Sequence, residues 1–284
     1  MRRIDAHHHI WDLSRRPQPW LLDAGLPKLH RTFDMRELTP TATEAGVVGT
    51  VLVQVLPSVA ETREFLALAA ADPLVQGVVG WVDLTAGGGA VAEAIAALRA
   101  GPGGDRLVGV RHLVQGERDP AWLAGPGVRA GLAAVAEAGL VYDLLVLPHQ
   151  LPAAIEAVRA LPGLRFVLDH LAKPPIASGE LLPWAGDLRR LAAEPNVSCK
   201  LSGLVTEAGG AGWTTERLRP YAEVALDAFG PRRLLFGSDW PVCLAAASYG
   251  DVVDAAAELT ARLTADERAD VFGDTARRVY GLAP

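Results

Sequence analysis

Three consecutive histidines, His7, His8 and His9, follow Ile4, Asp5 and Ala6 near the start of the chain. Side chains alternate along a strand, so His7 and His9 would point to one side and His8 to the other. Two imidazoles that project from the same face can chelate one metal ion. Packed core histidines are the ordinary alternative, whereas a purification-tag remnant is disfavoured because the run is embedded in Ile4–Trp11.

Polar residues also stand at or near the ends of several later apolar runs. They are Arg111, His112, Tyr142, Asp143, Asp169, His170, Lys200 and Asp239. Each has a bland interpretation when it is taken singly, since a histidine there is usually hydrogen-bonded scaffold and Asp239 could cap a helix. Taken together, these residues disfavour a purely structural interpretation, because several separate strands would all have to end in polar groups by chance.

The set His7, His9, His170 and Asp239 has the donor types of a hydrolytic Zn²⁺ site. A metal held in this way would lower the pKa of its bound water toward ~7 and would polarise a carbonyl. Asp239 could accept the proton of the attacking water and pass it to the leaving oxygen. These four residues therefore predict metal-assisted or carboxylate-assisted hydrolysis.

A second metal is not expected. Binuclear sites of this kind commonly use a bridging carboxylated lysine or a glutamate from the middle strands. The three lysines, Lys28, Lys173 and Lys200, lie outside the fourth and fifth expected strands, and neither strand holds a glutamate. We expect one divalent metal ion, Zn²⁺ by its donors, or none, and no organic cofactor.

The elements that must position these residues alternate along the chain. Strands are expected at Arg3–His9, Thr50–Val55, Val75–Val82, Leu107–Leu113, Leu140–Leu145, Arg165–His170, Val197–Leu201 and Arg233–Asp239. Several are unbroken apolar runs, as in parallel strands buried on both faces. Between them apolar residues recur at helical spacing, for example Leu151, Ile155 and Val158. Two closing helices are expected after Leu263, with Thr264 and Glu267 as a capping box.

Eight strands that alternate with helices in 284 residues predict an α/β fold, a (β/α)8 or TIM barrel, as a single domain over 1–284. A doubly wound open sheet is the competitor, but it usually carries a glycine-rich phosphate loop after its first strand, where this chain has the histidines. Barrel active sites form at the C-terminal ends of the strands. The segment from Trp11 to Phe33 is long for a connection and is expected to fold over the mouth.

Composition restricts the partners. The net charge of −6 argues against nucleic acid or an anionic membrane as the main partner, and no uncharged apolar run is long enough for a membrane helix. Cys199 and Cys243 are too few for a disulfide framework, and the start does not look like a signal peptide. We expect a cytoplasmic protein that acts on a small molecule, with a homo-oligomer left open.

Five ordered motifs carry a resemblance to a known family. They are Ile4–Trp11, Gly109–His112, Asp169–Pro175, Cys199–Gly203 and Leu235–Pro241. The chain resembles the amidohydrolase superfamily, in particular the amidohydrolase-2 branch of sugar- and dicarboxylate-lactone hydrolases, of the L-fuconolactonase, L-rhamnonolactonase and sulfomuconolactonase types. The resemblance runs from residue 4 to 241, and Phe272–Leu282 is similar to the closing helix of the family.

The resemblance implies a distorted barrel and the opening of a cyclic ester by water. Asp239 would be the general base and then the general acid, while His7, His9 and His170 would hold a metal or stabilise the oxyanion. His170 and His112 are the further catalytic candidates. Substrate contacts are expected from Arg111, Lys173, Tyr142, Trp11 and Trp240, whereas the roles of Lys200, Asp143 and His8 stay open.

Two other functions remain. Related branches of the superfamily include metal-dependent decarboxylases of carboxylated rings, and the spacing of the residues barely separates these from lactonases. A non-catalytic sugar- or metal-binding barrel is the third hypothesis, which the intact Asp239 and His170 disfavour.

Overall fold

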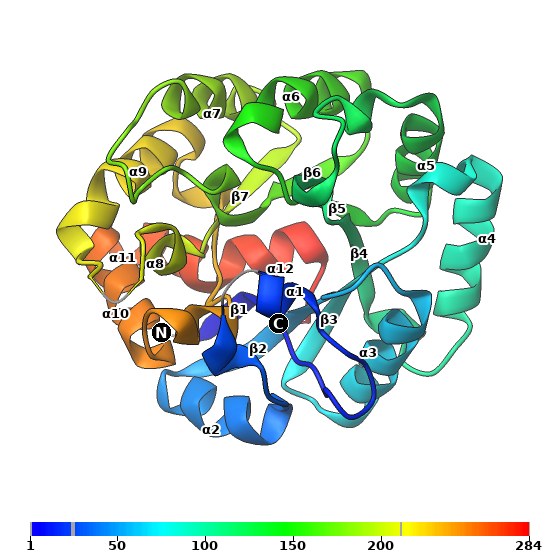
Figure 1. The fold of residues 1–284 in the computed structure, drawn as a ribbon, viewed down its shortest axis with the longest axis horizontal. Coiled ribbons are helices and arrows are strands. Elements are labelled where there is room, and N and C mark those ends of the chain that lie inside the picture. The colour runs from blue at the N-terminus through cyan, green and yellow to red at the C-terminus, as the bar shows by residue number, and fades with distance from the viewer. Residues whose placement is uncertain (1, 24–25, 211, 284) are drawn as a thin grey trace.

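The computed structural model describes residues 2–23, 26–210 and 212–283. Eight parallel strands form one sheet in the order β1-β2-β3-β4-β5-β6-β7-β8. Their bounds are β1 Arg3–His8, β2 Val47–Val53, β3 Val75–Gly80, β4 Leu107–His112, β5 Val141–Leu144, β6 Arg165–Leu168, β7 Val197–Leu201 and β8 Leu234–Phe236. The sheet curls into a ring with helices around its outside (Figure 1).

The ring closes between β1 and the segment that follows β8. The amide of His9 donates to the carbonyl of Trp240 (2.6 Å), and the amide of Asp239 donates to the carbonyl of His7 (2.8 Å). His8 and Trp240 form a parallel bridge at the same place. The predicted (β/α)8 barrel is confirmed, and the alternative of an open doubly wound sheet is wrong.

The helices alternate with the strands and pack around the barrel. They are α1 Trp20–Asp23, α2 Met35–Glu44, α3 Val59–Ala71, α4 Gly88–Arg99, α5 Pro126–Glu137, α6 Leu151–Ala160, α7 Trp184–Ala192, α8 Leu204–Glu207, α9 Thr215–Phe229, α10 Tyr249–Leu259, α11 Ala265–Ala269 and α12 Thr275–Tyr280. Side-chain caps begin several of them, as at Ser58 before α3 and Thr214 before α9. The predicted capping box of Thr264 and Glu267 is confirmed at α11.

Several strand bounds differ from the sequence prediction, and the backbone explains the two that bear on the site, at β6 and β8. β2 begins at Val47, earlier than expected, while β6 ends at Leu168 and β8 at Phe236. His170 and Asp239 have φ values of 51° and 57°, which a strand does not accommodate. The two side chains therefore lie on loops directly after the strands, where they turn toward the barrel mouth.

Two layers of core hold the barrel. The larger apolar cluster lies between the strands and the helices, and a smaller one that includes Ile4, Val51 and Val167 lies inside the ring. Helix α12 covers the end opposite the mouth, where Arg165 at the start of β6 donates to the carbonyl of Val279 (2.7 Å). No helix among residues 2–23, 26–210 and 212–283 has the length and apolarity needed to cross a bilayer.

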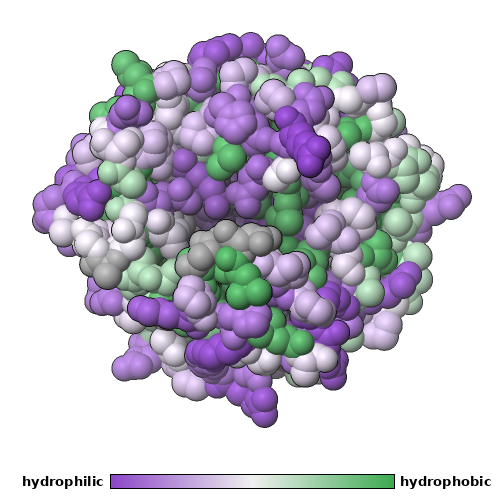
Figure 2. All heavy atoms as spheres, in the orientation of Figure 1, coloured by the Kyte–Doolittle hydropathy of each residue, from purple (hydrophilic) through white to green (hydrophobic). Residues whose placement is uncertain are grey.

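The segment after β1 returns across the mouth. Trp11 pairs with Phe33 in an antiparallel bridge, and α1 between them lies near the middle of the ring (Figure 1). Figure 2, in the same orientation, shows hydrophilic residues beside a hollow near the centre of this face. The described part of this segment thus borders the mouth, as the sequence predicts.

Candidate active site

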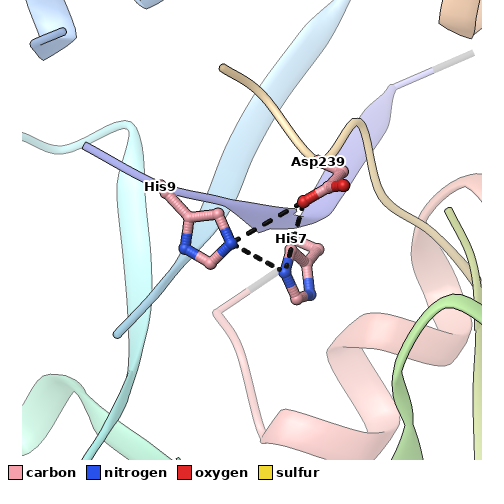
Figure 3. A group of neighbouring side chains, drawn as sticks. All are labelled: His7, His9 and Asp239. Atoms are coloured by element: carbon pink, nitrogen blue, oxygen red, sulfur yellow. Dashed lines mark hydrogen bonds and ion pairs between the residues drawn. The ribbon is translucent and has the colours of Figure 1, made fainter. Parts of the chain in front are cut away.

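Three imidazoles and one carboxylate meet at the C-terminal end of the barrel. The Nε2 atoms of His7 and His9 are 3.1 Å apart, and Asp239 Oδ1 lies 3.8 Å from the first and 3.7 Å from the second. Figure 3 shows the three side chains pointing toward one another from β1 and the loop after β8. His170 Nε2 lies 3.9 Å from the same Asp239 oxygen. The sequence-predicted cluster is therefore brought together in space.

Backbone contacts and close packing fix these side chains. His9 Nδ1 lies 2.8 Å from the carbonyl oxygen of Val53, which can only accept, so this nitrogen carries the proton and Nε2 presents a lone pair to the centre. His170 Nδ1 lies 2.8 Å from Ser202 Oγ. A Cβ on Gly237 would lie 2.7 Å from the Cβ of His7, so only glycine allows the loop after β8 to approach β1 this closely.

The loop that carries His170 has an unusual backbone. His170, Leu171, Ala172 and Lys173 all have φ between 51° and 58°, a region that costs non-glycine residues about 1–2 kcal/mol each. Trp184 Nε1 donates to the carbonyl of Leu171 (2.7 Å) and the amide of Lys173 donates to the carbonyl of His170 (2.7 Å). Strain that the surroundings hold in place in this way is typical of functional sites.

Burial governs the charges of the cluster. It raises the pKa of Asp239 to about 7, although Lys173 and Arg111 oppose the shift. It lowers the pKa of His170 to about 3 and holds the pKa values of His7 and His9 well below their usual range. The imidazoles are therefore neutral at pH 7, the form that binds metal, and Asp239 is poised to exchange a proton near neutrality.

A metal ion fits this donor set. Bonds of about 2.0–2.1 Å to tetrahedral Zn²⁺ place the ligand atoms about 3.4 Å apart. The separations of 3.1, 3.8 and 3.7 Å among His7, His9 and Asp239 lie on either side of that value. His7 also forms a second possible ligand group with Asp169 and His170. The chemistry and spacing of the residues thus match one divalent cation at this end of the barrel.

A group of buried, paired charges lies inside the barrel next to the histidine–aspartate cluster. Lys200 Nζ lies 2.9 Å from Asp169 Oδ1 and also contacts Asp143, while Arg111 Nη1 lies 2.9 Å from Asp169 Oδ2. Burial opposes the ionisation of Asp169, but Lys200, His7 and Arg111 together hold its pKa well below the usual range. Burial raises the pKa of Asp143 to about 6 in spite of Lys200. Two cations and two carboxyl groups are therefore enclosed within the barrel.

The cluster opens into a cavity. Two adjoining spaces of about 150 and 390 Å³ share Asp239 and His170 on their walls. Arg111 lines the first, and Lys173 and Trp20 line both. Such a volume suits a small molecule of the size of a monosaccharide. The cavity has cationic, carboxylate and apolar walls close to the imidazoles.

Comparison with known proteins places the chain in a family. The model of the amidohydrolase family (Amidohydro_2) matches residues 4–282. This chain belongs to the amidohydrolase family. It is 41% identical over 287 residues to the L-fucono-1,5-lactonase of Burkholderia ambifaria, a match that covers 99% of this chain and 96% of that protein. It is 40% identical over 294 residues to the enzyme of the same name from Burkholderia multivorans, with the same shares covered.

Solved structures agree with this assignment. An amidohydrolase from Burkholderia multivorans with bound zinc superposes on this amidohydrolase with a TM-score of 0.92, at 38% identity and with 100% of both chains covered. The same protein with bound HEPES gives a TM-score of 0.93. A relative thus binds a metal, and the present chain has a group of residues that fits one.

Strand alternation separates the predicted site residues of the amidohydrolase into two groups. His7, Arg111 and Asp143 reach the cluster or the charges below it. Their strand neighbours His8, His112 and Tyr142 necessarily point the other way. His8 Nε2 pairs with Thr50 Oγ1 (3.0 Å). Neither His112 nor Tyr142 lines the cavity beside Asp239, and their expected contacts with reactants stay predictions.

The surroundings of these two side chains are structural. The ring of His112 stacks on Trp122 at 4.2 Å, and Glu117 Oε1 lies 2.7 Å from its Nε2. Trp81 Nε1 donates to its other nitrogen (3.1 Å). Tyr142 is fully buried and packs edge-on against Phe166.

The two predicted tryptophans also lie outside the cavity walls. Trp11 lines a separate space of about 320 Å³ next to α3, and its Nε1 donates to the carbonyl of Arg31 (2.7 Å). Trp240 is buried and packs edge-on against Phe33. Neither ring lines the cavity beside Asp239, and the expected stacking of these rings on a substrate stays a prediction. Lys173 does reach the cavity, where its Nζ lies 3.6 Å from Glu207.

Sequence reasoning missed several cavity residues. Trp20, Gln115 and Glu207 lie on the walls, but each belongs to a connection whose path the sequence does not define. Trp20 belongs to the segment from Trp11 to Phe33, which the sequence predicts at the mouth of the barrel. The sequence therefore indicates the segment that reaches the cavity, but it does not single out Trp20 within it.

We expect Gly203→Ala to disturb His170 specifically. Gly203 has a φ of 70°, and a Cβ there would lie 2.8 Å from Cγ and Nδ1 of His170. Displacement of this ring by such a contact should lower kcat/KM by about 10- to 100-fold. Gly139→Ala is the matched control, because Gly139 also has a φ of 70° and its Cβ would meet nothing within 4 Å. Equal activity losses in the two variants would contradict the prediction.

Proposed function

We propose that this amidohydrolase opens a sugar lactone by hydrolysis. The proposal rests on one observation, the Asp239 carboxylate beside the three imidazoles on the wall of a cavity. The 41% and 40% identity to L-fucono-1,5-lactonases over almost the full length supports the same reaction class. The substrate is a cyclic ester of an aldonic acid, and the product is the open hydroxy acid.

Asp239 moves the proton in this reaction. It accepts one proton from water while the water oxygen bonds to the carbonyl carbon, and the ring C–O bond then breaks. Asp239 returns the proton to the alkoxide oxygen that leaves, so that no other acid is consumed. Its pKa, raised to about 7 by burial, suits both the uptake and the return of a proton near neutral pH.

Arg111 and His170 complete the reaction centre in this proposal. Asp169 and Gln54 hold the guanidinium, whose Nη2 donates to the Gln54 carbonyl (2.6 Å). Its position is thereby fixed before substrate arrives, and a fixed positive charge stabilises the developing oxyanion without reorganisation. The neutral ring of His170 lies on the cavity wall beside Lys173, which is placed to contact a substrate hydroxyl.

A metal ion would be held by His7, His9, His170 and Asp239, and Zn²⁺ is the cation that these donors favour. When bound, it would polarise the ester carbonyl and make its water more acidic. No organic cofactor is needed for the addition of water to an ester. Proton transfer by Asp239 and stabilisation of the oxyanion by Arg111 are supplied by side chains of the protein.

A screen of lactones tests the proposal. Aldonolactones, with L-fucono-1,5-lactone among them, and muconolactones are incubated with the enzyme, and acid release is followed with a pH indicator. We expect turnover of at least one aldonolactone and none of its ring-opened acid. Each assay is repeated after chelator treatment and again after Zn²⁺ is restored, which measures the metal requirement separately. The absence of acid release across the panel would contradict the proposal.

A decarboxylase is the second candidate. Two solved decarboxylases superpose with TM-scores of 0.67 and 0.68, but at 15% and 16% identity they share only the fold. Release of CO2 from carboxylated aromatic acids, without lactone turnover, would favour this function instead.

A further inference from the structure

Lys200 lies directly behind His7, on the side away from the cavity. Its Nζ is 3.0 Å from His7 Nδ1 and 2.9 Å from Asp169 Oδ1, and it also contacts Asp143 Oδ2. A lysine ammonium has three N–H donors and no acceptor. Its hydrogen bonds go to His7 Nδ1 and Asp143 Oδ2, whereas its contact with Asp169 Oδ1 is an ion pair. The contact with His7 is therefore a hydrogen bond in which Lys200 donates and Nδ1 accepts.

This contact determines where the proton of His7 resides. Lys200 at 3.0 Å and Arg111 Nη1 at 3.5 Å place two cations beside the ring, so the ring is neutral and carries one N–H. With Nδ1 occupied as an acceptor, that proton must lie on Nε2. Nε2 faces the lone pair of His9 Nε2 at 3.1 Å, which completes a hydrogen bond from His7 to His9.

With this placement of the proton, each donor in the series of hydrogen bonds meets an acceptor. Lys200 donates to His7 Nδ1, His7 Nε2 donates to His9 Nε2, and His9 Nδ1 donates to the carbonyl of Val53 (2.8 Å). The opposite arrangement would direct two lone pairs at each other across 3.1 Å. That arrangement is stable only when a cation lies between them.

Metal binding requires the other arrangement. A metal at Nε2 needs the lone pair there, so the proton of His7 must move to Nδ1. Asp169 Oδ1 lies 3.3 Å from Nδ1 and is placed to accept it, but Lys200 must first give up this nitrogen. A carboxylate partner that orients a metal-binding histidine in this way supports metal affinity, and Lys200 competes with it.

We infer that Lys200 is a positioning residue that holds the proton of His7 on Nε2 and thereby disfavours metal at the His7–His9–Asp239 site. The metal-free enzyme accordingly has an N–H, and not a lone pair, at the His7 nitrogen that faces Asp239. The inference depends on contacts around His7 and not on the identity of the substrate. It remains testable even if no lactone is turned over.

Nitrogen-15 NMR of the histidine rings tests the first part. Protonated and unprotonated ring nitrogens have well separated chemical shifts, and His7→Gln identifies the signals of His7. In chelator-treated wild-type enzyme we expect Nε2 to be the protonated nitrogen of His7. A proton on Nδ1 would overturn the inference, and this measurement needs no variant at position 200.

Zinc affinity without substrate tests the second part. Lys200→Met alone would leave two buried carboxylates short of a cation, so we combine it with Asp143→Asn, which leaves Arg111 to balance Asp169. Tyr280 Oη donates to Asp143 Oδ1 (2.8 Å) and is expected to donate to the asparagine oxygen in this variant. The double variant should bind Zn²⁺ at least 10-fold more tightly than wild type, with the proton of His7 now on Nδ1.

Asp143→Asn alone is the matched control. It keeps Lys200 in contact with both His7 and Asp169, so its His7 proton should stay on Nε2 and its zinc affinity should stay within 3-fold of wild type. Equal zinc affinity in the double variant and this control would contradict the inference. A structural role of Lys200 alone would weaken zinc binding, because a loosened site holds metal less well.

Discussion

Asp239→Asn is expected to lower kcat/KM roughly 10³-fold, because an amide cannot accept the proton of the attacking water. Asparagine has nearly the shape of aspartate and tolerates the left-handed backbone that residue 239 adopts, with a φ of 57°. The fold should therefore survive. The measurement is the steady-state hydrolysis of the best lactone in the panel, together with the thermal midpoint of unfolding.

A matched control separates catalysis from a general effect of carboxylate removal. Asp227 is an exposed aspartate that pairs with Arg262 at 2.6 Å, and Asp227→Asn should change kcat/KM by less than about 2-fold. Asp239→Asn activity within 10-fold of wild type would show that another group takes the proton.

The second large effect concerns stability. Lys200→Met should lower the free energy of unfolding by about 3–5 kcal/mol, because Asp143 and Asp169 would be left in the barrel interior without their shared cation. Urea unfolding followed by circular dichroism measures the loss. A lysine at the surface would show nearly no effect, so a loss below about 1 kcal/mol would mean that water or protons compensate the two carboxylates.

Removal of a partner charge should restore part of this loss. Adding Asp143→Asn to Lys200→Met removes one unpaired carboxylate, and we expect the two substitutions to couple favourably by about 1–3 kcal/mol in a double-mutant cycle. Tyr280 donates to Asp143 at 2.8 Å and can donate equally to the asparagine amide oxygen. Simple additivity of the two losses would contradict an ionic interaction between Lys200 and Asp143.

The barrel can be predicted from the sequence because each strand and each helix is indicated by the pattern of its own residues. Unbroken apolar runs and helical spacing specify each strand and helix separately, and polar residues that end such runs place chemistry at one end. His7, His9, His170 and Asp239 could be named together for this reason. The motif order supplied the family, since one His-x-His pair alone would not have done so.

The side chains whose directions the sequence leaves open depend on strand phase and on loop paths. His112 and Tyr142 directly neighbour Arg111 and Asp143, and only the register of β4 and β5 decides which of each pair points inward. Trp20 reaches the cavity through a connection with no periodic pattern. The partnership of Lys200 with His7 joins residues 193 positions apart and has no local signature.

The closure of the barrel has a consequence for how the enzyme matures. The first strand and the segment after the last strand meet through bonds such as that from the amide of Ser238 to Asp5, across 233 positions of the chain (2.8 Å). His7 and Asp239 lie on the two sides of this seam, so neither can work during synthesis until the ribosome has released almost the whole polypeptide. Contacts of such long range are slow to form. During refolding, enzyme activity should therefore return only when the barrel closes, which is later than the initial hydrophobic collapse of the chain.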